Sequence, residues 1–160
     1  MLKLAQRAAL FLVLSIIPSI PMLRAQQQST PSAPIPAQIL AAKKVFISNG
    51  GDDDLTIPRQ LHAPTLTYNQ FYADIKSWGK YELTSSPADA DVIFEIRSYD
   101  SREAGLQVHL AILDPKTHVI LWPLTQKIEG ASRTAIARKN FDEGMNALVG
   151  DLKKLVAGPQ

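Results

Sequence analysis

Apolar residues recur at the spacing of one helix face in two parts of the chain. In residues 65–81 the stripe is unusually aromatic, and it consists of Tyr68, Phe71, Tyr72, Ile75 and Trp78. In residues 133–156 it consists of Ala137, Phe141, Met145, Leu148, Leu152 and Leu155. Residues three or four positions apart share one side of an α-helix, so each segment is predicted to form an amphipathic helix that buries one face.

Polar residues and glycines mark where these helices begin, end and pack. Thr67 and Gln70 have the spacing of a capping box at the start of the first helix, and Gly79 stands where that helix should stop. In the second helix, Gly144 and Gly150 lower the helix propensity. One of these two glycines is therefore expected to allow a close approach to a sheet.

Five shorter segments have the length and composition of strands. They cover residues 43–48, 81–85, 92–96, 106–113 and 118–124. The first should end in a turn at residues 49–51, and the third is an almost entirely apolar run, which is typical of a central strand. The last two flank Asp-Pro-Lys-Thr at 114–117, a turn signal that predicts an antiparallel hairpin.

The order of these elements is strand, helix, four strands and helix. The simplest arrangement that buries every apolar face is an α+β fold of two layers. We expect a mixed sheet of about five strands, with one parallel crossover followed by an antiparallel meander, and two helices packed on one face.

Residues 1–25 are predicted to be a signal peptide, because a positive start and an apolar core precede a plausible cleavage site at Ala25. Without cleavage the same segment would remain as a membrane anchor. Residues 26–41, rich in Gln, Ser and Pro, are predicted to be a flexible tether, and residues 42–157 a single domain. We therefore expect an exported protein, periplasmic or secreted, that meets the membrane only through an uncleaved N-terminal segment.

Charge and cysteine content narrow the classes of partner and chemistry. Removing the signal peptide removes three of the 17 basic residues and none of the 15 acidic ones, so the remaining chain is close to neutral. Nucleic-acid binding needs a concentrated positive surface and is not expected. The chain has no cysteine, which excludes disulfides, a cysteine nucleophile and a lipid-modified cysteine. Motifs of serine hydrolases, phosphate-binding loops and zinc proteases are also absent from the sequence.

The three histidines offer little for catalysis or metal binding. His109 and His118 should share one face of the hairpin at a separation of roughly 13 Å, which is too far for a common zinc ion. We expect His109 to pack beside Trp122 and His118 to lie at the turn. His62 stands alone in a long loop.

The stretch ISNGGDDD, residues 47–54, is the densest group of potential metal ligands. Neighbouring aspartates in extended backbone point in opposite directions, so at most Asp52 and Asp54 could share an ion. Asp89 and Asp91 precede the central strand and are the other weak candidates. A divalent cation would require the two pairs to meet in the fold, and otherwise the aspartates are solvated turns and caps. No cofactor is expected.

A resemblance to other proteins extends over about residues 43–156. It rests on three segments, which are YNQFYADIKSWGKYELTSSPADADVIFEI, LDPKTHVILW and NFDEGMNALVGDLKKL. The chain resembles a group of small, exported, uncharacterised bacterial proteins with an ADxVFEI strand, a DPKTxxxLW hairpin and an FDxxxxxLVxDLK helix. More distantly, it is similar to periplasmic accessory domains of envelope assembly and transport machinery. These relatives bind other proteins, so the resemblance implies no catalytic residue.

Three hypotheses about function follow from these observations. The first is an exported non-enzymatic domain that binds a protein partner in the cell envelope. The second is a small-ligand or divalent-cation binding module that uses the loop at 49–54 with Asp89 or Asp91. The third is a hydrolase without a recognisable motif, built around His62 and nearby carboxylates.

Overall fold

The computed structural model describes residues 33–52, 65–101 and 105–158. The predicted signal peptide, Asp54 and His62 lie outside these residues. Within the described ranges, no helix is long and apolar enough to cross a membrane.

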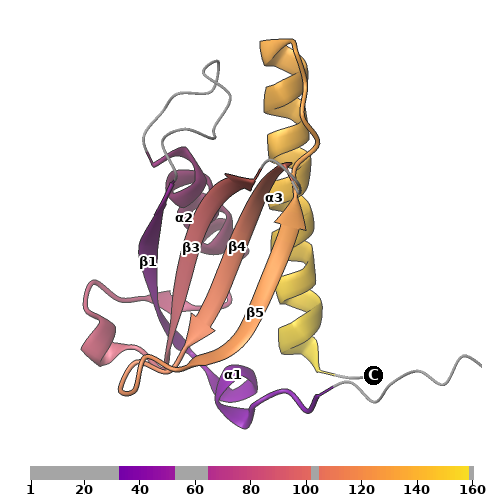
Figure 1. Ribbon diagram of the computed structural model, residues 1–160. Helices are drawn as coiled ribbons and strands as arrows, with labels where there is room; N and C mark the ends of the chain where they lie inside the picture. The colour runs from indigo at the N-terminus through magenta and orange to yellow at the C-terminus, as the bar shows by residue number, and fades with distance from the viewer. Residues whose placement is uncertain (1–32, 53–64, 102–104, 159–160) are drawn as a thin grey trace, which may run out of the picture. The chain divides into compact units, whose positions relative to one another are not determined.

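Five strands form one sheet in the order β2-β1-β3-β4-β5, and α2 and α3 lie together behind it (Figure 1). The strands are β1 (Lys44–Asp52), β2 (Glu82–Leu83), β3 (Val92–Ser101), β4 (Gly105–Leu113) and β5 (Ile120–Lys127). The helices are α1 (Ala37–Ala41), α2 (Leu66–Trp78), the 3-10 helix η2 (Pro87–Asp89) and α3 (Thr134–Ala157). β1 pairs in parallel with β2 and β3, whereas β3, β4 and β5 pair antiparallel. The predicted α+β class, mixed sheet and final hairpin are confirmed.

The core lies between one face of the sheet and the two long helices. Alternate residues of β3, namely Val92, Phe94 and Ile96, are fully buried on this face. They belong to one apolar cluster with Phe71 of α2 and Met145 of α3. Because β3 has a strand on each side and helices behind it, it is a central strand, as predicted, and Glu95 is the one polar residue within residues 92–96.

The first strand is longer than predicted, because the chain does not turn at residues 49–51. β1 keeps its pairing with β3 as far as Asp52, with an irregular register after Asn49. Gly50 lies so close to β3 that a Cβ atom there would meet two side chains at 3.0 and 3.2 Å, and Gly51 has a φ of 94°. The glycines therefore permit a bulge within the strand rather than a reversal of the chain.

The predicted capping box of α2 is wrong, but its C-terminal stop is confirmed. The helix begins after Thr65, whose φ is 75°. Thr67 is a buried helix residue, and its hydroxyl donates to the hydroxyl of Ser98 on β3 at 3.3 Å. Gln70 forms its hydrogen bond within the helix rather than with the first turn. Gly79 ends the helix with a φ of 69°, a conformation that glycine adopts without strain.

The predicted tether extends too far into the domain. Residues 37–41 form α1, and Ile39 within it is 1% exposed and belongs to the core cluster. Pro36 precedes the helix with a ψ of 131°, and its C=O accepts from the Ile39 N–H at 3.0 Å. Proline residues that suggested a flexible segment here direct the chain into a short helix with a buried anchor.

Gly144 is the glycine of α3 that allows a close approach to the sheet. A Cβ atom at this position would overlap the end of the Ile128 side chain, which is 3% exposed. At Gly150 an added Cβ would have no atom within 4 Å.

Replacing these two glycines by alanine should have opposite effects on stability. Gly144→Ala should lower the free energy of unfolding by about 1–2 kcal/mol, because buried Ile128 has to move. Gly150→Ala is the matched control and should raise it by up to about 1 kcal/mol through helix propensity. Urea titration of each variant measures both values. Ile128→Val removes the Cδ1 atom that the new methyl group would meet, so in the Gly144→Ala background it should restore part of the lost free energy of unfolding. If no stability is restored, Ile128 is not the residue that Gly144 accommodates.

Tyr81 carries the one buried side-chain oxygen of the described residues that has no hydrogen-bond partner. Burial raises the pKa of this phenol to about 12. Tyr81→Phe should therefore raise the free energy of unfolding at pH 7 by about 1 kcal/mol, because it removes an unpaired polar group. Below pH 10 the phenol is neutral in the folded and the unfolded chain, whereas between pH 10 and 12 it ionises more readily in the unfolded chain. Wild type therefore loses stability as the pH rises through 12, and the variant, which has no phenol, should also resist alkaline unfolding better.

Chemical denaturation at pH 7 and pH 11 tests both parts of this expectation. Tyr99→Phe is the control, because the Tyr99 hydroxyl donates to Gln107 Oε1 at 3.2 Å and its removal offers no gain. Equal effects of the two substitutions would contradict the role given to Tyr81.

Candidate functional site

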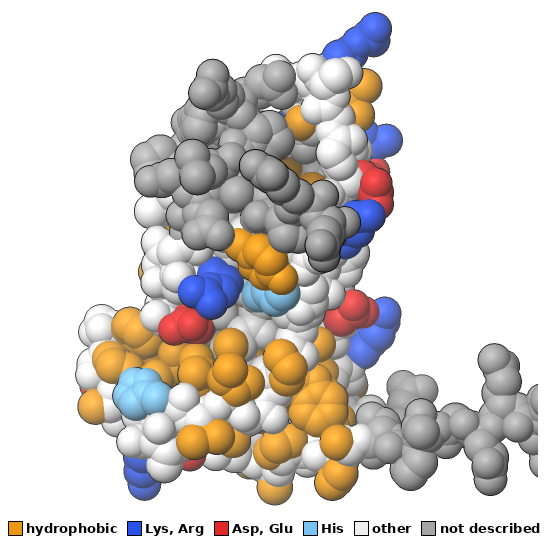
Figure 2. Space-filling view, viewed as in Figure 1, with side chains coloured by type: hydrophobic (Ala, Val, Ile, Leu, Met, Phe, Trp, Pro, Cys, Tyr) orange, Lys and Arg blue, Asp and Glu red, His pale blue; other side chains and the backbone are white. Residues whose placement is uncertain are grey.

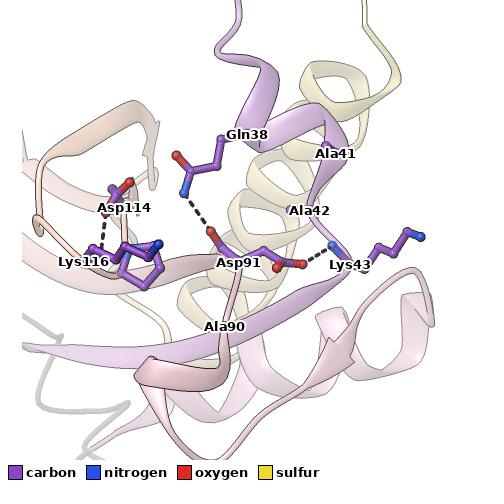
Figure 3. A pocket seen from close by; sticks show the side chains of 9 residues that line it. Gln38, Ala41, Ala42, Lys43, Ala90, Asp91, Asp114 and Lys116 are labelled. Atoms are coloured by element: carbon purple, nitrogen blue, oxygen red, sulfur yellow. Dashed lines mark hydrogen bonds between the residues drawn. The ribbon is translucent and has the colours of Figure 1, made fainter.

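Asp91 joins three elements at the edge of the sheet where β1 and β3 begin (Figure 3). Its Oδ2 accepts from the backbone N–H groups of Lys43 at 2.8 Å and Lys44 at 2.9 Å. Its backbone C=O accepts from the Gln38 side chain of α1 at 2.8 Å. The two N–H donors lower the pKa of Asp91, so the carboxylate is ionised in the folded chain. These bonds fix the end of α1 and the start of β1 against β3.

Asp114 plays the equivalent part in the turn between β4 and β5. Its Oδ1 accepts from the N–H groups of Lys116 at 2.7 Å and Thr117 at 2.9 Å, which lowers the pKa of Asp114. Asp91 and Asp114 line one cavity of about 580 Å³ with residues of α1 and the turn. Each carboxylate is directed at backbone amides, which stabilise its ionised form.

Asp52 and Asp91, two of the aspartates proposed as metal ligands, lie at opposite ends of β1. β1 and β3 are parallel, Asp91 lies where they begin, and Asp52 is the last residue of β1. Eight strand positions separate Lys44 from Asp52, which corresponds to roughly 26 Å. Asp89 lies in η2, before β3 begins, and Asp54 is outside the described residues. In the described part of the chain, no group of three or more histidine or carboxylate side chains could hold a metal ion.

His109 does not pack beside Trp122, contrary to prediction, because the connection between β4 and β5 spans residues 114–119 and the register shifts once more after Ile120. Trp122 pairs with Ile112, and His109 instead pairs with Thr125. The His109 ring stacks on Tyr99 with centroids 4.4 Å apart.

Both ring nitrogens of His109 have hydrogen-bond partners. Nε2 lies 3.1 Å from Gln107 Oε1, which can only accept, so Nε2 carries the proton. The Thr125 hydroxyl, 3.0 Å from Nδ1, is then the donor. Burial and, secondarily, the charge of Arg97 lower the pKa of His109 and keep the ring neutral near pH 7. His118 lies in the turn with a φ of 55°, so the two histidines do not form a site.

The sheet face opposite the helices is uncovered by any described helix and changes character along its length. A row of cross-strand neighbours, Phe46, Ile93, Leu113 and Ile120, runs across it near the β4–β5 turn. Ile93 and Leu113 are 4% and 8% exposed although they lie outside the main core cluster. Farther along the strands the same face carries polar side chains, among them His109. Figure 2 shows hydrophobic side chains gathered over the lower part of this view.

Val119, just before β5, and Ile120, its first residue, make this apolar corner accessible. Val119 and Ile120 are 59% and 57% exposed, the highest values among the large hydrophobic residues that the structure describes. The sequence contained a signal for this feature, because residues 119–122 form an unbroken apolar run on a strand. A strand with only one buried face should alternate instead. We define the apolar corner as Val119, Ile120 and the row of neighbours beneath them.

No protein-family model matches the chain, and no curated protein matches it by sequence, so the resemblance described above stays a prediction. Among solved structures, it is similar to the PelC dodecamer from Paraburkholderia phytofirmans, with TM-score 0.45 and 14% identity over 80% of this chain and 96% of that one. A neuraminyllactose-binding hemagglutinin homolog from Helicobacter pylori gives 0.42 and 9% over 72% and 86%. Uncharacterized lipoprotein B from Nitrosomonas europaea gives 0.41 and 11% over 80% and 90%. Likeness at this level says nothing about what the chain does.

Removing the Asp91 carboxylate should test its structural role. Asp91→Ala should lower the free energy of unfolding by about 1 kcal/mol at pH 7, because two backbone N–H groups lose their acceptor. Its pKa lies below the ordinary value of 3.8, so wild type holds its full advantage above about pH 4 and loses it as the pH falls through the lowered pKa. Thermal unfolding between pH 2 and pH 7 measures this trend.

Asp89→Ala is the matched control, since Asp89 is an exposed aspartate two residues earlier. It should change stability by less than about 0.5 kcal/mol at every pH. An Asp91 effect that is independent of pH, or no larger than that of Asp89, would contradict the role of the carboxylate.

Proposed function

We propose that this chain is an exported, non-enzymatic domain that binds a protein partner of the cell envelope through the uncovered face of its sheet. The observation that carries the proposal is the apolar corner, where Val119 and Ile120 are more than half exposed beside a sheet face that no described helix covers. Accessible apolar groups that adjoin one another are typical of surfaces that bind another protein.

The surroundings of the apolar corner have the composition of a binding surface. Ile120 is the cross-strand neighbour of Leu113, which in turn neighbours Ile93, and both of these are buried, so burying the exposed part would continue an existing apolar layer. Glu95 and Arg97 lie on the same face beyond this row and provide polar groups at its margin. An apolar centre with a polar rim is the usual anatomy of a protein interface.

The Asp114 turn gives this surface a fixed shape. In addition to its carboxylate bonds, the Asp114 N–H donates to Val119 O at 3.0 Å, and His118 N–H donates to Asp114 O at 2.9 Å. These bonds hold the backbone immediately before Ile120. A preorganised surface loses little conformational entropy on binding, which favours affinity.

The non-enzymatic part of the proposal is supported by how the candidate chemical groups are used. Asp91 and Asp114 accept hydrogen bonds from backbone amides, and both nitrogens of His109 are engaged by neighbouring side chains. Export is supported by the sequence of residues 1–25, with its positive start and apolar core.

A charged substitution at the apolar corner should remove the partner. The tagged full chain is expressed in its source cells, crosslinked mildly, and recovered from the envelope fraction for quantitative mass spectrometry. Wild type should recover a reproducible partner, and Ile120→Glu should recover at least about tenfold less of it, because an unpaired carboxylate would be buried in the interface.

Ile136→Glu provides the matched control, since Ile136 is 45% exposed on α3 rather than on the sheet. It should recover the partner as wild type does. No reproducible partner, or equal losses with both variants, would contradict binding through the apolar corner. Thermal unfolding of both variants should give midpoints within a few degrees of wild type, as expected for substitutions at exposed positions.

A further inference from the structure

The outer edge of β1 is paired along only a small part of its length. β2 contributes two residues, which pair with Lys44 and Val45. The last rung is the bond from Thr84 N–H to Val45 O at 3.0 Å. β1 nevertheless continues to Asp52. Beyond Val45, no strand among the described residues lies on this side of β1.

The backbone hydrogen bonds show which groups of β1 point to this open side. The C=O of Val45 accepts from the β2 side, whereas the C=O of Lys44 accepts from Asp91 N–H on the β3 side. Successive residues of a strand direct their backbone groups to alternate sides. Ile47 and Asn49 therefore present their N–H and C=O groups past the end of β2, at the spacing that another strand would match.

A cavity of about 320 Å³ opens beside these groups. Its lining consists of Phe46, Ile47, Tyr68, Tyr72, Leu83, Thr84 and Ser85, none of which is charged. Tyr68 and Tyr72 come from α2, which lies beside β1 in Figure 1, and their ring centroids are 6.1 Å apart. Tyr72 is 37% exposed, so an aromatic surface faces solvent next to an open sheet edge.

We propose that this edge groove binds an extended segment of another polypeptide, which adds a strand to the sheet in the space that β2 leaves. The backbone groups of Ile47 and Asn49 take its hydrogen bonds, and an inward-pointing side chain packs against Tyr68 and Tyr72. The uncharged lining selects apolar or aromatic residues at the inward positions. Strand addition of this kind combines main-chain affinity with side-chain selectivity at alternate residues.

The opposite edge of the sheet is less suited to accept a strand. β5 contains Pro123 in its middle, which has no N–H to donate. The bond from Ile128 N–H to Leu106 O shows that even-numbered residues here direct their N–H toward β4, so the nitrogen of Pro123 stands where a donor would otherwise point outward. Proline on an edge strand is a common obstacle to strand addition. The same obstacle is missing from the open part of β1.

Peptide selection followed by backbone methylation tests the proposal. Random twelve-residue peptides displayed on phage are selected on the full chain, and the best sequence is synthesised. It should carry apolar or aromatic residues at alternate positions. Two forms of this peptide are then compared, one N-methylated at its odd-numbered residues and one at its even-numbered residues, which defines two methylation phases. One form should bind at least about tenfold more weakly and the other nearly as well as the parent, because only every second N–H faces β1.

Variants of the chain locate the bound peptide. Tyr72→Ala should weaken binding about tenfold, and hydrogen exchange at the Ile47 and Asn49 amides should slow when the wild-type chain is saturated. Ile120→Glu is the control and should bind the peptide as wild type does, so this proposal can fail or succeed independently of the function proposed for the apolar corner. Failure to select any peptide, or binding that depends on neither Tyr72 nor the methylation phase, would overturn it.

Discussion

Two long helices cover one face of a five-stranded sheet, and this single coverage governs the rest of the molecule. On β3 it places Val92, Phe94 and Ile96 in the core and leaves Glu95 and Arg97 on the other side. A two-layer fold buries only half of each strand's side chains, so polar residues should fill the uncovered face. They do so around His109, but not near the β4–β5 turn, where the apolar row and exposed Ile120 lie. That exception is the main reason to infer a partner.

Two aspartates hold the framework of this sheet, and one of them, Asp91, was among the candidate metal ligands. Asp91 receives two backbone N–H groups from the start of β1, and Asp114 receives two from the turn. In both places the backbone donors have no strand or helix partner, so an ionised side chain nearby supplies the acceptor. The Asp91 bonds also connect α1 to the sheet through Gln38. The apolar corner and the edge groove are thus built on fixed backbone rather than on mobile loops.

Long periodic segments were predictable from the sequence, and local exceptions were not. The helices α2 and α3 were predictable because burial of one face imposes a period on the residues. The β4–β5 turn was predictable because Asp-Pro is itself a turn signal. The extension of β1 through Gly50 and the hydrogen bond from Thr67 to Ser98 depend on neighbours far along the chain. Residues 37–41 misled for a different reason: they directly follow the proline-rich part of the chain and resemble its continuation, and only the packing of Ile39 makes them part of the domain. The separation of Asp52 from Asp91 likewise required the parallel pairing of β1 and β3.

Alternate residues of the sheet lie either on the helix face or on the opposite face, and on the opposite face the apolar corner is accessible to solvent. Methyl NMR of the full chain with a soluble paramagnetic agent tests this most directly. The methyl groups of Val119 and Ile120 should be broadened strongly, while those of Leu110 and Ile112, which are 1% and 0% exposed, should be protected. Equal protection of Ile120 and Ile112 would show that the uncovered face is covered in solution and would contradict the account.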